Sequence, residues 1–287
     1  MRSVTVQIPA TTANLGPGFD CLGVALQIYN RVVVHRRDEN ENKSDVKKIA
    51  DHPPIIAAAA DAFFKNAQRA AFDFDLEISG DVPRSRGLGS SVTVRLGLLH
   101  ALNVLSELPL SSQKLFEICV QLEGHPDNAA PAAFGGFTVA GGETIARFEV
   151  LPSLRFVLLI PDFEIATPDA RRVLPMQLDR LAAVQSCANA CRVTAAFAAH
   201  RYELLRGAFR DGLHQPFRKP LIPFLDEIIA AGENAGALGG FLSGSGSTIC
   251  CVAFEENAQQ VADAMRSKKR DAKIAIAAAD NEGAKIF

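Results

Sequence analysis

Apolar and polar residues alternate at the start of the chain, where Val4, Val6 and Ile8 are separated by polar residues. A period of two is typical of a strand with one buried face, and Pro9 is expected to end this strand. Alternation or short apolar runs predict further strands at residues 29–35, 75–79, 156–160, 249–254 and 273–279. Longer segments of helical composition predict helices at residues 55–70, 92–103, 111–123, 126–134, 177–200, 224–235 and 257–269.

The order of these elements mixes strands and helices without a strict strand–helix–strand rhythm, which favours an α+β fold. The chain has 287 residues, enough for two domains of ordinary size. We place the boundary near Pro152, which gives an N-terminal domain of residues 1–152 and a C-terminal domain of residues 153–287. Residues 36–51 are rich in charge and Asn, and they predict an exposed loop or hairpin.

Composition narrows the class of protein. Lys and Arg number 30 against 32 Asp and Glu, which gives a net charge of -2 and argues against a nucleic-acid-binding protein. Residues 234–254 are uncharged, but five glycines make them too polar for a membrane span, and the N-terminus has no apolar signal segment. The six cysteines form no C-x-x-C pair, so we expect reduced thiols in a cytoplasmic protein rather than zinc ligands.

The most specific chemical signal is the loop of residues 83–91, Pro-Arg-Ser-Arg-Gly-Leu-Gly-Ser-Ser, directly before a predicted helix. Gly87 and Gly89 allow the backbone N–H groups to turn inward, and Ser90 and Ser91 place hydroxyls at the positive end of the helix. These features predict a phosphate-binding loop with a hydroxyl available to a metal ion. The alternative is an ordinary glycine-rich turn in which Ser90 is the helix N-cap. Neither G-x-x-x-x-G-K-[ST] nor G-x-G-x-x-G is present.

Three other segments combine polar side chains with turn-forming residues. Asn14 and Asp20, after the first strand, could bond a polar substrate or serve only as turn residues. Residues 123–128, Glu-Gly-His-Pro-Asp-Asn, could hold Mg²⁺ and position a nucleophile, or end one helix and cap the next. The predicted Gly/Ser loop of residues 239–248 could close over a nucleotide, support the phosphate loop, or act as a flexible linker.

In this order the four segments resemble the GHMP kinase superfamily, and in particular its members that act on L-homoserine. The match begins with Pro-Ala-Thr-Thr-Ala-Asn-Leu-Gly-Pro-Gly-Phe-Asp at residues 9–20 and reaches residue 248, so it covers nearly the whole chain. The resemblance implies an N-terminal ribosomal-protein-like domain with a left-handed βαβ crossover and a ferredoxin-like C-terminal domain. It also implies transfer of the γ-phosphoryl group of MgATP to the side-chain hydroxyl of L-homoserine, giving O-phospho-L-homoserine in threonine biosynthesis.

Two arginine-containing segments resemble those that hold the substrate carboxylate in these kinases. They are residues 167–175 and residues 214–221, the second within a predicted Pro-rich loop at 215–223. A planar guanidinium fork suits a carboxylate, whereas Arg172 is expected on the surface. The resemblance implies that Asp20 pairs with the substrate ammonium group. The implied substrate and catalytic residues are Asn14, Asp20, His125, Asp127, Thr167, Arg171 and Arg218.

The resemblance also implies a set of nucleotide and metal residues. Residues implied to bind the phosphates of ATP are Pro83, Arg84, Ser85, Arg86, Gly87, Leu88, Gly89, Ser90, Ser91, Ser243, Gly244, Ser245 and Gly246. Ser91 and Glu123 are the implied Mg²⁺ ligands, with Glu117 as a second candidate for the carboxylate. Asn14 is implied near the substrate hydroxyl, and Asp127 matches the position of a catalytic base in other members.

The chain departs from the family pattern in three places. Arg84 and Arg86 stand where small or apolar residues are common, and residues 92–95, Val-Thr-Val-Arg, replace an Ala-rich helix start. Residues 36–51 are short for a region that often contacts adenine, which leaves the nucleotide preference open.

Two alternative functions stay open from the sequence. One is a GHMP kinase for another alcohol, such as mevalonate or a sugar; the paired arginines and Asp20 favour an amino acid instead. The other is a non-catalytic protein of this fold that binds an amino acid or nucleotide and regulates another protein; the phosphate-loop glycines argue against it. Homodimers are common in the family, but no interface patch is evident in the sequence. No nucleic-acid or membrane partner is expected.

Overall fold

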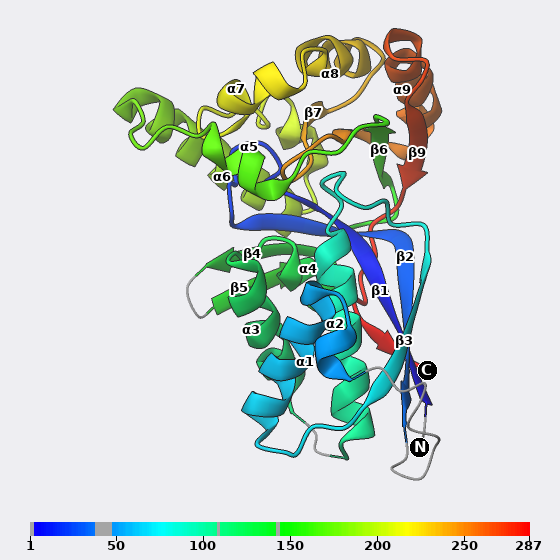
Figure 1. The fold of residues 1–287 in the computed structure, drawn as a ribbon. Coiled ribbons are helices and arrows are strands. Elements are labelled where there is room, and N and C mark those ends of the chain that lie inside the picture. Colours follow the sequence, from blue (N-terminus) through cyan, green and yellow to red (C-terminus); the bar gives the residue numbers. More distant parts are fainter. Residues whose placement is uncertain (1–2, 38–47, 108–109, 142–143) are drawn as a thin grey trace.

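The computed structural model describes residues 3–37, 48–107, 110–141 and 144–287. Most of the loop predicted at 36–51 lies outside these residues. The described chain forms two antiparallel sheets, one of six strands and one of four, each with helices packed against it (Figure 1). The α+β arrangement predicted from the sequence is confirmed.

The first sheet is built on two long strands that pair along their whole length. In spatial order its strands are β10 (Lys285–Ile286), β1 (Ser3–Ala13), β2 (Leu22–Arg36), β4 (Phe137–Gly141) and β5 (Thr144–Phe148), with β3 (Phe74–Gly80) beside β2. β3 pairs with the C-terminal half of β2 and β4 with its first residues.

The prediction that Pro9 ends the first strand is wrong. Pro9 lies opposite Tyr29 within the ladder, and the register shifts between Pro9 and Ala10. A bulge tolerates proline because the missing N–H falls where the regular ladder is already interrupted. The second strand likewise begins at Leu22 rather than near residue 29. The two strands therefore carry the loop between them, residues 14–21, beyond the first sheet to the second, where Gly244 N–H bonds the Ala13 carbonyl.

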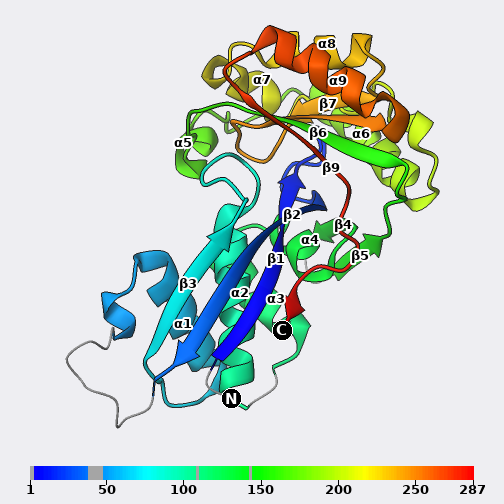
Figure 2. The same cartoon turned by 90° about the vertical axis from the view of Figure 1, so that its right-hand side faces the viewer.

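One face of the first sheet is covered by helices, which lie behind it in Figure 2. They are α1 (Pro54–Ala67), α2 (Ser90–Leu105), α3 (Ser112–Glu123) and α4 (Ala129–Phe134). Val6 and Val32 from the strands and Phe63 and Leu96 from the helices belong to one buried core. Contact is close at Gly97, where an added Cβ would lie 2.5 Å from a methyl group of Val32. This packing fixes α2 relative to β2.

The second sheet has the strand order β7-β8-β6-β9. Its strands are β6 (Leu154–Ile160), β7 (Gly239–Leu242), β8 (Ile249–Phe254) and β9 (Lys273–Ala277). Helices occupy the connections from β6 to β7 and from β8 to β9, which is the ferredoxin-like order. The helices are α5 (Thr167–Arg172), α6 (Arg180–Ala198), α7 (Gln215–Arg218), α8 (Leu225–Asn234) and α9 (Glu255–Lys268).

Both faces of the second sheet are buried, which explains the continuous apolar run in β6. Val157 and Leu159 pack on the side of α8 and α9. Phe156 and Leu158 face the opposite way, into a core that includes Leu22 and Phe137 of the first sheet. This shared core holds the two sheets together.

Short elements escaped prediction. β4, β5 and α5 were not expected, residues 239–242 of the predicted Gly/Ser loop form β7, and the predicted Pro-rich loop contains α7. Segments of four to six residues are too short to show a periodicity, and their stability comes from tertiary partners. Apart from β1 and β2, the longer helices and strands lie within a few residues of their predicted ranges.

We propose that the domain boundary lies between β5 and β6, near residue 152, with one exception at the C-terminus. β10 pairs with β1, and the Phe287 N–H donates to the Thr5 carbonyl at 2.8 Å, so the last residues join the first sheet. Among the described residues, no helix combines the length and apolar character needed to cross a membrane.

Candidate active site

A cavity of about 390 Å³ lies where the two sheets meet. Its walls come from the loop after β1, the first turn of α2, the end of α3, α5, α7 and the β7–β8 loop. The sequence-predicted residues that line it are Asn14, Asp20, Arg84, Ser85, Arg86, Gly87, Gly89, Ser90, Ser91, Glu123, His125, Asp127, Thr167, Arg171, Arg218, Gly244 and Ser245. Four others do not line it, namely Pro83, Leu88, Ser243 and Gly246.

Residues 83–91, the glycine loop, bend at two positions whose backbone conformation only glycine adopts without strain. Gly87 and Gly89 have φ angles of +74° and +68°. A Cβ on Gly87 would lie 2.1 Å from the Ser243 carbonyl oxygen. Gly89 is the N-cap of α2, and no side chain caps this helix, so Ser90 is its first residue rather than its cap. The uncapped N–H groups of a 16-residue helix therefore face the cavity as a site for anions.

Ser243 supports this loop from outside the cavity. It is fully buried, and its hydroxyl donates to the Gly87 carbonyl at 2.7 Å. The Ser243 hydroxyl also lies 2.8 Å from that of Thr12. The Leu88 carbonyl accepts from the Thr11 N–H at 3.2 Å. The β7–β8 loop and β1 thus hold the glycine loop in place.

A carboxylate and a hydroxyl meet beside the glycine loop. The Ser91 hydroxyl donates to Glu123 Oε2 at 3.0 Å. The other oxygen, Oε1, lies 2.5 Å from a guanidinium nitrogen of Arg95. Glu117, the second candidate for this role, lies along α3 outside the cavity wall, where it pairs with Lys114. Hydroxyl and carboxylate oxygens are the donors that Mg²⁺ prefers, so Ser91 and Glu123 fit such an ion, whereas the Glu117 carboxylate is not part of the cavity lining.

A carboxylate–guanidinium pair crosses the far end of the cavity. Arg171 of α5 donates to both oxygens of Asp20, at 2.7 and 3.0 Å. The ring of Phe19 lies beneath two guanidinium groups, 5.5 Å from Arg171 and 5.3 Å from Arg218. The side chains of Asp20 and Arg171 are only about one-third exposed, which strengthens their interaction relative to a surface pair.

Asn14 joins two loops at this end. Its Nδ2 donates to the Gly244 carbonyl at 3.0 Å, and its Oδ1 accepts from the Asp20 N–H at 3.0 Å. Asn14 has a positive φ of +70°, a conformation that Asn tolerates better than most residues. One N–H and one lone pair of the amide remain for a ligand.

His125 and Asp127 form a pair between the two ends of the cavity. His125 Nδ1 lies 2.6 Å from Oδ1 of the buried Asp127, and Asn128 N–H donates to the same oxygen. Burial lowers the pKa of His125, but the hydrogen bond and charge of Asp127 outweigh it and raise this pKa above its ordinary value. Ligand atoms of Asp20, His125 and Asp127 lie within 4.8 Å of one another. This cluster is suited to a cationic group.

The two unexpected arginines have different surroundings. Arg86 Nε donates to the Pro161 carbonyl at 2.9 Å, and its other nitrogens lie near Asp162 and Glu164 of the second domain. Arg86 therefore ties the glycine loop to the segment after β6. Arg84 lines the cavity, and its carbonyl accepts from Arg86.

Sequence reasoning missed an apolar part of the cavity and one polar residue. The apolar wall consists of Pro53, Ile55, Ile56, Ile78, Val92 and Val94, which lie on α1, β3 and α2 or directly beside them. The sequence does not show that these segments meet, because each has the composition of an ordinary core segment. Asn128 also lines the cavity, and its side chain accepts from the Thr11 hydroxyl at 2.7 Å; its place beside Asp127 was the available signal.

We expect Gly87→Ala to lower the affinity for ATP at least about tenfold. The new Cβ would meet a backbone oxygen, which cannot move aside as a flexible side chain would. Gly207→Ala is the matched control, because its φ of +71° is similar but nothing lies within 4 Å of its Cβ position. Both variants carry the same strain of about 1–2 kcal/mol, so only the first should weaken binding of a fluorescent ATP analogue. Equal affinities would contradict the close-approach argument.

Comparison with known proteins agrees with this architecture. The families described as "GHMP kinases N terminal domain" and "GHMP kinases C terminal" match residues 54–136 and 193–271. A homoserine kinase of Microchaete diplosiphon is 38% identical, covering 99% of this chain and 97% of its own. A homoserine kinase of Clostridium botulinum is 35% identical, over 99% of this chain and 98% of its own.

Solved structures give the same result for the fold. The crystal structure of homoserine kinase from Cytophaga hutchinsonii has a TM-score of 0.88 at 25% identity, with 100% of this chain and 98% of that chain covered. Methanococcus jannaschii mevalonate kinase, at 13% identity and a TM-score of 0.73, shares the fold over 96% of this chain and 98% of its own. Both the sequence relatives and the two-sheet architecture lead to one assignment: the chain belongs to the homoserine kinase family of the GHMP kinases.

Proposed function

We propose that this cavity is the active site in which the chain transfers the γ-phosphoryl group of ATP to the side-chain hydroxyl of L-homoserine. The product is O-phospho-L-homoserine, an intermediate on the route to threonine. One observation carries the proposal: a single cavity combines an uncapped, glycine-lined helix N-terminus with a carboxylate–guanidinium pair. The first feature suits phosphates, and the second suits the two charges of an α-amino acid.

The substrate end is matched to a zwitterion. Asp20 and Arg171 neutralise each other in the structure, and an amino acid supplies one partner for each of them. Its ammonium group would take Asp20, and its carboxylate would take Arg171 together with Arg218. A mevalonate-type acid that took Arg171 would leave Asp20 without a cation, which is costly in a partly buried site, and a neutral sugar would supply a charged partner to neither residue.

The nucleotide end is divided between polar and apolar surfaces. The N–H groups at the start of α2 and the backbone of the glycine loop would hold the phosphates. The apolar wall offers a dry surface to a flat ring and so suits the adenine base. Three elements contribute to it, α1 with Ile55, β3 with Ile78 and α2 with Val94. Ser243 and Leu88 would act by supporting the loop rather than by contact.

We further propose that Ser91 and Glu123 hold Mg²⁺ with the phosphates. When bound, this ion neutralises charge on the phosphate oxygens and helps to align them. Arg95 holds Glu123 Oε1, so Oε2 is the oxygen turned toward Ser91 and the cavity. The ion pair thereby fixes the orientation of the carboxylate before any ligand arrives.

Catalysis in this site would rest on alignment. Phosphoryl transfer through a loose transition state is accelerated mainly by positioning and by electrostatic stabilisation. We place the substrate hydroxyl near His125. Asp127 holds Nδ1 of this ring and does not fix the other nitrogen, Nε2. Thr167 and Asn128 complete the wall around that position.

We also propose that two copies of the chain associate through α6. Exposed apolar residues follow one side of this helix, with Leu181 76% and Val184 60% exposed. Arg192 is the one charged residue in the sequence from 181 to 199, which is unusual for a solvent-exposed helix.

Light scattering should therefore give about twice the chain mass of 30.7 kDa. Leu181→Asp replaces the most exposed leucine of the apolar surface, in the first turn of α6, by a charge and should shift the mass to that of one chain. Arg180→Asp, next to it, is the control for added negative charge at the edge of the surface. A monomeric wild-type chain at micromolar concentration would contradict this proposal.

The function is tested by ADP release with ATP and either L-homoserine, mevalonate, galactose or L-serine. We expect rapid turnover with L-homoserine alone. Arg171→Ala should raise KM for L-homoserine about 10- to 100-fold, since it removes a charge-assisted pair of hydrogen bonds, and should leave KM for ATP nearly unchanged. Arg172→Ala is the neighbouring control, because Arg172 is 76% exposed and pairs with Asp169.

Two outcomes would count against this assignment. Turnover of mevalonate or galactose would show a different alcohol as the substrate. ATP binding without turnover of any alcohol would favour the regulatory alternative.

The metal assignment is tested with Glu123→Gln. The amide keeps the shape and can still bond Ser91 and Arg95, but it lacks the charge that attracts Mg²⁺. We expect the Mg²⁺ concentration for half-maximal rate to rise on the order of 10- to 100-fold, and Mn²⁺ bound with ATP, followed by electron paramagnetic resonance, to weaken in parallel. Glu117→Gln removes the same charge outside the cavity and should change neither value. An effect of Glu117→Gln as large as that of Glu123→Gln would reject the assignment.

A further inference from the structure

Arg218 is an unusual wall residue, because its guanidinium group lines the cavity although the residue is only 2% exposed. Its Nε donates to the Ala170 carbonyl and its Nη1 to the Gly244 carbonyl, both at 3.0 Å. Burial and the nearby charge of Arg171 lower its pKa to about 10, so it stays charged at neutral pH. A buried cation that is to bind an anion needs acceptors that fix the orientation of its guanidinium group without neutralising its charge.

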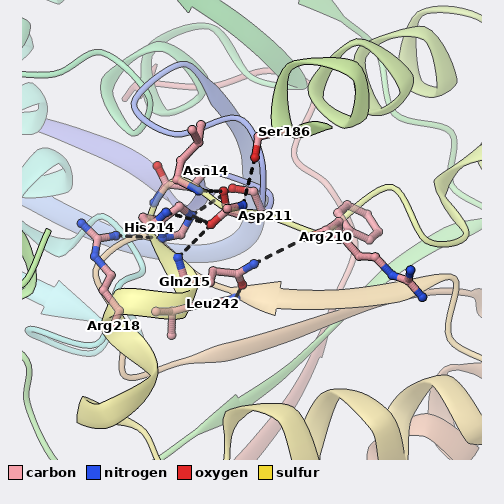
Figure 3. Close-up of polar contacts among 12 residues, drawn as sticks. Asn14, Ser186, Arg210, Asp211, His214, Gln215, Arg218 and Leu242 are labelled. Atoms are coloured by element: carbon pink, nitrogen blue, oxygen red, sulfur yellow. Dashed lines mark hydrogen bonds and ion pairs between the residues drawn. The ribbon is translucent and has the colours of Figure 1, made fainter. Parts of the chain in front are cut away.

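His214 supplies one of these acceptors (Figure 3). Its Nδ1 lies 3.2 Å from Arg218 Nη1, and a guanidinium group can only donate. Nδ1 is therefore unprotonated, and the ring proton is on Nε2, which donates to the Gly16 carbonyl at 2.9 Å. The side chain is fully buried, and burial lowers the pKa of His214 to about 4, in agreement with a neutral ring.

The ring of His214 is itself held from several directions. The carboxylate of Asp211 accepts backbone N–H groups of Leu213, His214 and Gln215 at 2.6 to 3.0 Å. This fixes the turn that leads into α7. On its other side the ring of His214 stacks on Phe19, with centroids 5.3 Å apart. Rotation of the imidazole is thus restricted by its neighbours.

A neutral acceptor has a physical advantage here. A carboxylate in contact with Arg218 would bind it strongly and compete with a carboxylate ligand. Asp211 does provide a carboxylate, but it lies behind the ring of His214, with its Oδ2 3.4 Å from His214 Nε2. Arg218 consequently keeps its charge for the cavity. Among the described residues, Ala170, Gly244 and His214 engage Nε and Nη1, so Nη2 is the nitrogen that remains for a ligand.

We infer that His214 is a positioning residue for substrate specificity: its neutral Nδ1 orients the Arg218 guanidinium so that Nη2 meets the substrate carboxylate. This inference rests on the proposed function, in which that carboxylate belongs to L-homoserine. His214 does not touch the substrate or the phosphates. It acts on the affinity for the amino acid and not on the transfer step.

Two substitutions separate the two ring nitrogens of His214. His214→Asn places an amide oxygen close to the position of Nδ1 and preserves the acceptor for Arg218. His214→Gln places an amide nitrogen close to the position of Nε2 and preserves the donor to Gly16. We expect H214Q to raise KM for L-homoserine about tenfold or more, with kcat and KM for ATP within about twofold of wild type. H214N should restore most of the affinity for L-homoserine, and Arg218→Ala sets the upper limit of the loss.

A purely structural role for His214 predicts a different pattern. If its task were to hold the loop at Gly16, H214N would be the damaging variant and KM for ATP would change with that for L-homoserine. Wild-type affinity for L-homoserine in H214Q, or equal losses in both variants, would overturn the inference. Failure of the wild-type chain to turn over L-homoserine would instead refute the proposed function, so the two failures are distinguishable.

Nitrogen-15 spectra of the histidine rings give a second test that does not need an active variant. With L-homoserine bound, the ring of His214, identified by its loss in H214N, should show a protonated Nε2 and an unprotonated Nδ1 between pH 6 and 8. A protonated Nδ1, or a cationic ring in this range, would overturn the inference even if H214Q did not fold.

Discussion

The close approach of two loops, one from each domain, is the constraint on which the rest of the site depends. Gly87 lies so near the Ser243 carbonyl that one added carbon atom, a Cβ on Gly87, would force the two loops apart. Around this contact, Ser243 bonds the Gly87 carbonyl, Gly244 bonds Ala13, and Thr248 bonds Arg86. The cavity takes Asn14 and Asp20 from the first domain and Arg171 and Arg218 from the second, and this contact helps to set the separation of the two groups. In a reaction that depends on alignment, that separation is a catalytic property.

Charge in the cavity is arranged in partly compensated groups. Arg95 balances Glu123, Arg171 balances Asp20, and Arg218 faces a neutral ring with Asp211 behind it. Each pairing lowers the cost of holding an ion away from water, yet leaves an oxygen or nitrogen for a ligand. In the proposed function, the two substrates would therefore enter a site whose electrostatic field is already oriented, and little reorganisation would be required of the protein.

The sequence predicted the general architecture and most of the cavity lining, but not the supporting contacts. The glycine loop and residues 123–128 were identifiable because their residue types are rare in ordinary core segments. The apolar wall was not, because Ile55, Ile78 and Val94 come from three elements whose meeting is decided by tertiary packing. The pairing of Asp20 with Arg171 spans 151 positions of the chain, so neither residue announces the other locally. Pro9 shows the opposite error, in which a strong local preference yielded to a bulge.

The return of β10 to the first sheet links the order of synthesis to the order of folding. β1 is made before the second sheet, yet among the described residues the strand that pairs with its outer edge is β10, which is made after that sheet. Until then β1 is an open edge strand, the kind of surface that invites pairing with another chain. The first sheet is therefore complete only after the residues that follow the second sheet have been made.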